Sequence, residues 1–165
     1  QRILIHAGAG GVGHYAVQLA HWKGAHVITT ASARNADFVR ALGADEVIDY
    51  TRTPFEKAVR DVDMVFDTVG GEVQQRSWQI LKKGGILVSI LALTVPEEAQ
   101  QQGWRSAYVF VQPNAAQLAQ IAGLIDAGKV KPVVGNVFPL HEAAKAHAAV
   151  QSGHTRGKIV LRVVD

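Results

Sequence analysis

The sequence contains no cysteine, and this absence excludes disulfide bonds and every zinc site that depends on thiolate ligands. It also lacks any apolar run of about 18 residues, the length that a membrane helix needs, and no signal peptide precedes the first apolar segment. We therefore expect a cytoplasmic protein with no membrane partner and no metal. Because the chain begins at Gln1 without Met, we expect it to start inside a longer protein.

Charge is modest as well, with 17 Lys and Arg against 14 Asp and Glu in 165 residues and a net charge of +3. The basic residues are scattered, so they suit a small polyanion at least as well as a nucleic acid, and we expect no nucleic-acid partner. Apolar residues make up 48% of the chain, which is enough for the core of one compact domain.

Apolar segments of strand length alternate with segments of helical period along residues 2–132. This alternation predicts an α/β fold, a doubly wound Rossmann parallel sheet with helices on both faces and strand order 3-2-1-4-5-6. In the first helix, Val12, Ala16, Leu19 and Ala20 form a stripe that we expect to face the sheet, with His14, Gln18 and His21 facing away.

The last 33 residues, 133–165, read as a separate C-terminal tail of strand, helix and strand, with the helix beginning near Pro139. We accordingly divide the chain into a cofactor-binding Rossmann domain, 1–132, and this tail. Val133, Val134, Phe138 and Leu140 are expected to form an exposed apolar patch if the tail has no partner.

Residues 8–13 read GAGGVG, a GxGxxG motif that follows a strand and opens a helix. Glycines at these positions permit a tight turn, let the backbone approach a pyrophosphate and let strand and helix pack closely. Amide groups at the helix start then favour phosphate charge. The motif favours a dinucleotide; a purely structural turn or an S-adenosylmethionine fold of the methyltransferase type stays open.

The end of the second strand, TTASARN, lacks the acidic residue that would bind the ribose of NAD. Ser32 can instead donate a hydrogen bond to the 2′-phosphate of NADP, and Arg34 can supply positive charge to it. The pattern therefore favours NADP(H). In the simpler interpretation, Ser32 caps the next helix and Arg34 is a solvated charge.

The DTVGG turn, 67–71, lies at the carboxyl end of the fourth strand, where the sheet order places Thr68 and Val69 beside the nicotinamide. We interpret Asp67 as a structural acceptor of backbone N–H groups rather than a catalytic acid. His6, at the end of the first strand, is most simply a satisfied polar residue. His141 and His147 are six residues apart, so they do not make an HExxH zinc helix.

Taken together, HAGAGGVG, TASARN, LGADEVIDY, FDTVGG, LKKGGILVS and GHTRGKIVL resemble the medium-chain dehydrogenase/reductase superfamily, and within it the zinc-independent quinone oxidoreductase-like branch. The resemblance covers nearly the whole chain. It implies the cofactor-binding half of a two-domain, NADPH-dependent enzyme that passes hydride to a quinone or an α,β-unsaturated carbonyl compound. It also implies a homodimer and a GroES-like N-terminal domain that supplies the unidentified catalytic residues.

The resemblance and the residue patterns together predict cofactor contacts along the chain; Arg34 is assigned from its charge and Val69 from the strand order. The residues expected at the pyrophosphate are Ala9, Gly10, Gly11, Val12 and Gly13, and those expected at the 2′-phosphate and adenosine are Ser32, Arg34 and Tyr50. Thr68 and Val69 are expected on the nicotinamide side, and the tail loop is expected to contribute His154, Thr155 and Arg156. Tyr50 as a core aromatic and Arg156 as a surface charge stay open. So do two other functions: an enoyl reductase domain of a larger synthase, and a non-catalytic nucleotide-binding module.

Overall fold

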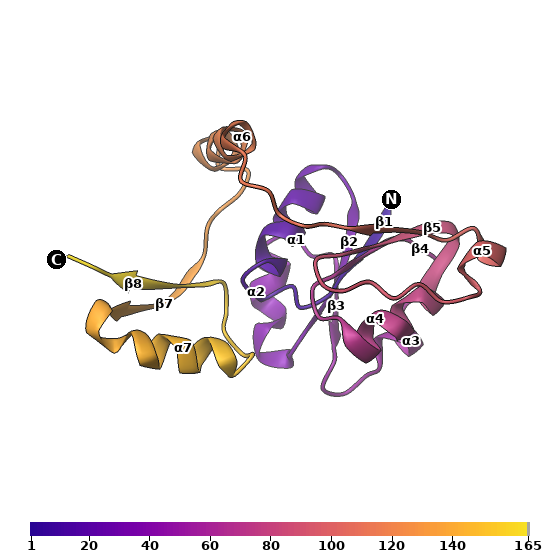
Figure 1. The fold of residues 1–165 in the computed structure, drawn as a ribbon, viewed down its shortest axis with the longest axis horizontal. Coiled ribbons are helices and arrows are strands. Elements are labelled where there is room, and N and C mark those ends of the chain that lie inside the picture. The colour runs from indigo at the N-terminus through magenta and orange to yellow at the C-terminus, as the bar shows by residue number, and fades with distance from the viewer. Residues whose placement is uncertain (165) are drawn as a thin grey trace.

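A computed structural model describes residues 1–164 and contains two separate parallel sheets (Figure 1). The main sheet has six strands in the order β3-β2-β1-β4-β5-β6, which confirms the predicted doubly wound topology. Its strands are β1 (Arg2–Ile5), β2 (His26–Ala31), β3 (Glu46–Asp49), β4 (Val62–Asp67), β5 (Leu81–Ser89) and β6 (Arg105–Tyr108).

Helices cover both faces of this sheet and divide the apolar core in two. Leu4 belongs to one buried cluster and its neighbour Ile5 to the other, because successive side chains of a strand point to opposite faces. The helical elements of this part are α1 (Gly13–Trp22), η1 (Ala33–Asn35), α2 (Ala36–Ala41), α3 (Phe55–Ala58), α4 (Gly71–Ser77), η2 (Trp78–Ile80) and α5 (Ala99–Gln102).

Helix α1 follows the expected stripe only in part: Ala16 and Ala20 pack against the buried cluster of the sheet, as predicted. Val12 is 41% exposed, whereas Val17 is fully buried against the sheet. His14 and Gln18, which are expected to face away from the sheet, are both buried rather than exposed to solvent. His14 bonds through Nδ1 to the carbonyl oxygen of Gly10 and its Nε2 has no partner among the described residues, whereas Gln18 exchanges hydrogen bonds with the backbone of Lys131, 113 residues further along the chain.

The second sheet pairs only β7 (Val134–Pro139) with β8 (Lys158–Arg162), and η3 (Leu140–Glu142) and α7 (Ala143–Gln151) connect these strands. Figure 1 shows this unit beside α2, apart from the main sheet, with helix α6 (Ala115–Asp126) standing clear of both. Of the predicted patch, Val134 and Leu140 are exposed and Val133 and Phe138 are half-buried. Through residue 164, no helix combines the length and hydropathy required to span a bilayer.

A close backbone contact joins β1 to α1. A β-carbon at Gly13 would lie 2.1 Å from the carbonyl oxygen of Ala7, so only glycine fits there. Ala7 itself has φ of 52°, the left-handed conformation, so the turn is made by an alanine rather than by the first glycine of the motif. Hydrogen bonds from the Ala7 N–H to Thr30 Oγ1, 3.0 Å, and from the Gly10 N–H to the Ala7 oxygen, 2.9 Å, hold it.

We predict that Gly13→Ala destabilises the fold by about 3 kcal/mol, because overpacking a rigid backbone contact forces strand and helix apart. Gly123→Ala in α6 is the matched control, since its β-carbon would have no neighbour within 4 Å. Alanine favours a helix over glycine, so this control should gain up to about 1 kcal/mol. Urea unfolding of both variants measures the difference; equal stability of Gly13→Ala and the unmodified chain would contradict the prediction.

Candidate functional site

A continuous groove follows the carboxyl ends of the central strands, where the topology of a doubly wound sheet places ligands. Its larger part, a cavity of about 360 Å³, is lined mainly by apolar side chains and by His6 and Arg76. Its smaller part contains the glycine turn, Ser32 and Arg34. Ala7, Thr30, Tyr50 and Gly153 line both parts, so the two form one site.

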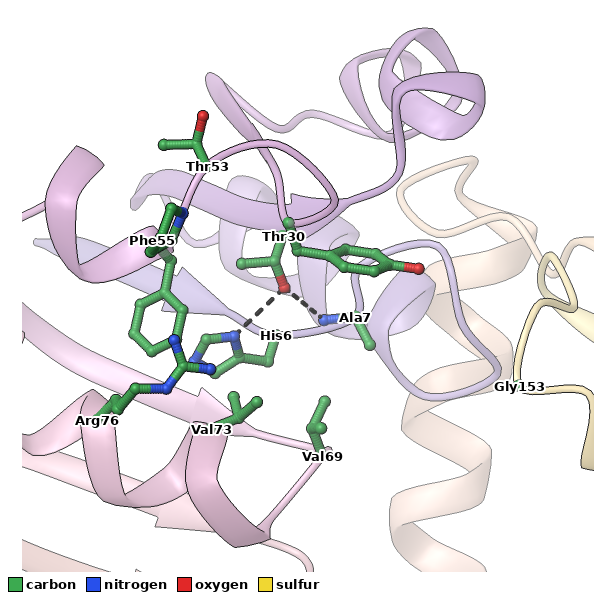
Figure 2. Close-up of a pocket in the computed structure, with 11 residues that line it drawn as sticks. His6, Ala7, Thr30, Thr53, Phe55, Val69, Val73, Arg76 and Gly153 are labelled. Carbon is green, nitrogen blue, oxygen red and sulfur yellow. Dashed lines mark hydrogen bonds between the residues drawn. The ribbon is translucent and has the colours of Figure 1, made fainter.

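His6 anchors the larger cavity through a chain of hydrogen bonds, part of which Figure 2 shows. Its Nε2 lies 2.9 Å from Ser77 Oγ, whose proton is donated to the carbonyl of Val73, so Nε2 carries the hydrogen. Nδ1 therefore accepts from Thr30 Oγ1 at 3.3 Å, and that oxygen accepts the N–H of Ala7. His6 thus stabilises the left-handed turn at Ala7 indirectly, through the hydroxyl of Thr30.

Burial lowers the pKa of His6 to about 4, and the charge of Arg76 adds to this effect, whereas the charges of Asp67 and Glu56 oppose it. The ring is 1% exposed and packs edge-on against Phe55 with 4.7 Å between ring centroids. The imidazole is therefore neutral at physiological pH, which fits its interpretation as a satisfied polar residue.

Asp67 organises the turn that closes the groove at β4. Its Oδ1 accepts the N–H groups of Val69 and Gly70, at 2.9 and 2.8 Å, and its Oδ2 accepts from Gln74 and Ser89, each at 2.8 Å. Burial alone would raise the pKa of this carboxyl, but these hydrogen bonds outweigh burial and lower it. The structure thus confirms the structural role expected for Asp67.

The glycine turn has a cation beside it. A β-carbon at Gly11 would lie 3.4 Å from Nζ of Lys158, the first residue of β8. The tail is fixed there because the N–H of Gly157 donates to the carbonyl of Ala9 at 2.9 Å. Val12 precedes α1 with no side-chain cap, and the N–H groups of His14, Tyr15 and Ala16 donate to the carbonyls of Gly10 and Val12, which leaves the Gly13 N–H for a ligand. Burial and Lys158 both lower the pKa of His14, against the Gly10 carbonyl, which raises it.

Ser32 and its neighbours form the other end of the groove. The Ser32 side chain makes no capping hydrogen bond to η1, so the simpler interpretation as a helix cap is wrong. Asn35 is 8% exposed and donates from Nδ2 to Ser32 Oγ at 3.3 Å. Its Oδ1 accepts from Nε and Nη2 of Arg156, at 3.1 and 2.9 Å, and the same guanidinium lies 4.8 Å from the centroid of the Phe38 ring.

The structure brings many of the predicted site residues together. Those that line the smaller part of the groove are Ala9, Gly10, Ser32, Arg34, Tyr50, His154 and Thr155. Gly11, Val12 and Gly13 continue the turn into α1. Thr68 donates from Oγ1 to the carbonyl of His6 at 2.9 Å, and Val69 lines the larger cavity with Tyr50. Arg156 is turned toward Asn35.

Sequence reasoning did not assign Lys158, Asn35 or the apolar wall formed by Phe55 and Val73. The GKIVL segment brings Lys158 to the first loop only through the parallel pairing of β7 and β8, which spacing along the chain does not reveal. Asn35 follows Ser32 by three residues, and this spacing is a signal that could have linked the two side chains.

No three His, Asp or Glu side chains gather within residues 1–164 in a way that could hold a metal ion. Glu142, in the segment that superficially resembles a zinc helix, pairs with Lys145 at 2.7 Å instead.

Comparison with known proteins identifies the family of the chain. The family model described as zinc-binding dehydrogenase matches residues 42–161. A mitochondrial NAD(P)H oxidoreductase of Danio rerio is 33% identical over 100% of this chain and 50% of its own length. An NADPH-dependent alkenal/one oxidoreductase of Arabidopsis thaliana is 37% identical over 96% of this chain and 40% of its own. The solved quinone oxidoreductase of Coxiella burnetii is 43% identical, with a TM-score of 0.93, and the match covers 99% of this chain and 53% of that one.

The fold and the groove define a dinucleotide-binding domain of the doubly wound class. The chain belongs to the medium-chain dehydrogenase/reductase superfamily, is quinone oxidoreductase-like, and corresponds to the cofactor-binding domain of that family. It spans about half the length of the curated relatives it matches.

The pKa of His6 predicts a pH-dependent stability. The folded protein keeps His6 neutral down to about pH 4, whereas the unfolded chain protonates it near 6.5, so protons favour the unfolded state between these values. The free energy of unfolding should therefore fall as pH drops from 6.5 toward 4. The contribution of His6 to this loss is at most about 3.4 kcal/mol, at 1.36 kcal/mol per pKa unit.

Urea unfolding of the unmodified chain and of His6→Gln, at pH 7 and pH 4.5, measures this share. Gln offers a donor in place of Nε2 but does not titrate, so the loss of stability on acidification should be smaller in the variant. Buried His14 acts in the same direction and leaves part of the loss in place. An unchanged pH dependence in His6→Gln would show that His6 contributes nothing.

Proposed function

We propose that this domain binds NADP(H) for an oxidoreductase that transfers hydride to a quinone or an α,β-unsaturated carbonyl compound without zinc. The observation that carries the proposal is the single groove that joins the glycine turn to Ser32, Arg34 and Tyr50 with no acidic side chain among its lining residues. Relatives named as quinone, NAD(P)H and NADPH-dependent alkenal/one oxidoreductases support it.

The groove accommodates the adenosine half of the cofactor in a particular orientation. Because the 2′-phosphate and adenine are attached to the same ribose, the apolar cavity next to Ser32 and Arg34 suits the adenine ring. Phe55, Val69 and Val73 would contact that ring, with Tyr50 between it and the phosphate. Val69 would then lie on the adenosine side rather than beside the nicotinamide.

The pyrophosphate would lie over the glycine turn, near the N–H of Gly13 at the start of α1. The Lys158 ammonium group, 3.4 Å from the position that a β-carbon of Gly11 would take, would supply a positive charge to it. The tail loop carries His154 and Thr155 into the groove beside Arg34, which donates from Nη2 to the carbonyl of His154 at 3.3 Å. Residues from both ends of the chain would thus hold the cofactor.

NADPH, when bound, supplies the hydride for reduction. The residues of this chain would bind and orient it, since placing a reactive carbon against its acceptor is the main contribution a protein makes to hydride transfer. Groups that stabilise the acceptor oxygen are proposed to come from the remainder of the longer protein. The exposed apolar side chains of the tail, Val134, Val137 and Leu140, suit a contact with that remainder.

Titration of the purified chain with NADPH and NADH, followed by nicotinamide fluorescence, tests the cofactor. We expect NADPH to bind at least about tenfold more tightly, because a charge-assisted hydrogen bond and an arginine meet the extra phosphate. Equal or tighter binding of NADH would overturn the NADPH assignment, and binding of neither would overturn the site. Reduction of quinone, enone and enoyl thioester substrates by the longer protein identifies the acceptor class.

Lys158→Ala should weaken the binding of NADPH and of NADH by the same factor, about three- to tenfold, because both cofactors carry the pyrophosphate that the ammonium group would face. Lys83→Ala, which removes an exposed lysine of β5 outside the groove, is the matched charge control. The same titrations measure it. If only NADPH binding were weakened, Lys158 would contact the 2′-phosphate rather than the pyrophosphate, contrary to this prediction.

A further inference from the structure

Asn35 stands between the tail and Ser32, and its amide has a defined orientation. A guanidinium group carries only hydrogen-bond donors, so the atom that faces Nε and Nη2 of Arg156 must be the amide oxygen. The amide nitrogen is then the atom directed at Ser32 Oγ, 3.3 Å away. Arg156 thus determines which end of Asn35 meets the serine.

The orientation of Asn35 determines what Ser32 can do. An amide N–H group donates, so Ser32 Oγ accepts on that side and cannot direct its own proton there. Among residues 1–164, Ser32 Oγ accepts from Asn35 and donates its proton to no protein acceptor. The hydroxyl hydrogen is therefore available to the groove that Ser32 lines with Arg34. A reversed amide would present an oxygen to Ser32 and take the proton away from the groove.

Further contacts hold this arrangement in place. The Arg156 guanidinium stacks on the Phe38 ring and also donates from Nη2 to the carbonyl of Arg34 at 3.3 Å. In return, Arg34 donates to the carbonyl of His154 on the tail loop. Because Asn35 is 8% exposed, water has little access to compete for its amide.

We propose that Asn35 is a specificity-positioning residue for NADPH: held by Arg156, it keeps the Ser32 hydroxyl as a proton donor to the 2′-phosphate. This proposal rests on the proposed function, since it concerns the same cofactor groove. It assigns Asn35 and Arg156 an indirect role, through Ser32, in distinguishing NADPH from NADH, which has a hydroxyl in place of the phosphate.

Asn35→Asp tests the proposal while retaining a partner for Arg156. A carboxylate has no N–H group, so it would accept both from Arg156 and from the Ser32 hydroxyl, and the proton would turn away from the groove. We expect the Kd for NADPH to rise about tenfold or more, the size of a lost charge-assisted hydrogen bond, while the Kd for NADH changes less than about twofold. A parallel loss for both cofactors, as a merely structural defect would produce, overturns the proposal.

The same substitution in a Ser32→Ala background separates the effect of the proton from that of the new negative charge. If Asn35 acts through Ser32, Asn35→Asp reduces the NADPH-to-NADH preference by a smaller factor without the hydroxyl than with it. An equal factor in both backgrounds would mean that the carboxylate acts by charge alone, and this outcome also overturns the proposal.

Arg156→Gln provides a third arm, because it frees the Asn35 amide to reverse. NADPH binding should weaken selectively, by about threefold or more. Arg162→Gln, which removes the same charge from an exposed position on β8 outside the groove-lining residues, should leave the preference unchanged. Equal effects of the two arginine variants would overturn the role of Arg156. The unmodified chain decides the proposed function separately: if it does not prefer NADPH, that function fails before any variant is compared.

Discussion

The contact between Gly13 and the carbonyl of Ala7 is the constraint on which the rest of the site depends. It brings the start of α1 against the end of β1 so closely that no β-carbon fits, and it requires the chain to turn at Ala7 in a conformation that costs alanine about 1–2 kcal/mol. Thr30 and His6 hold that turn by hydrogen bonds. Because this turn is made, Ala9 and Gly10 line the groove directly before the start of α1.

Two buried polar groups beside the groove solve the same electrostatic problem in opposite ways. Burial of His6 is met by removing its charge, so that a neutral ring serves as donor on one side and acceptor on the other. Burial of Asp67 is met by keeping the charge and surrounding it with four donors. The first supports the turn after β1 and the second the turn after β4, the two strands between which the sheet order reverses direction.

The strand order and the glycine turn could be predicted from sequence, because alternating apolar segments and GxGxxG report local geometry directly. The burial of polar side chains on α1 could not, since Gln18 is bonded to the backbone of Lys131, which lies 113 residues further along the chain. The position of Lys158 and the hydrogen bonds between Asn35 and Arg156 could not be predicted for the same reason, because each depends on how the tail returns to the first loop. Apolar patterns therefore predict the fold, whereas the polar contacts that complete the site join segments that are distant in the sequence.

The hydrogen bond from Gly157 to Ala9 has a consequence for where this module ends. A boundary drawn after Pro132 separates the six-stranded sheet from the two-stranded sheet. The part that contains the main sheet then has only some of the residues that line the groove, because Gly153, His154 and Thr155 lie in the tail. The segment that forms the main sheet is therefore shorter than the segment that would bind a dinucleotide, because the second also includes the tail loop. A transplant of this binding capacity into another protein would have to carry the chain at least as far as Lys158.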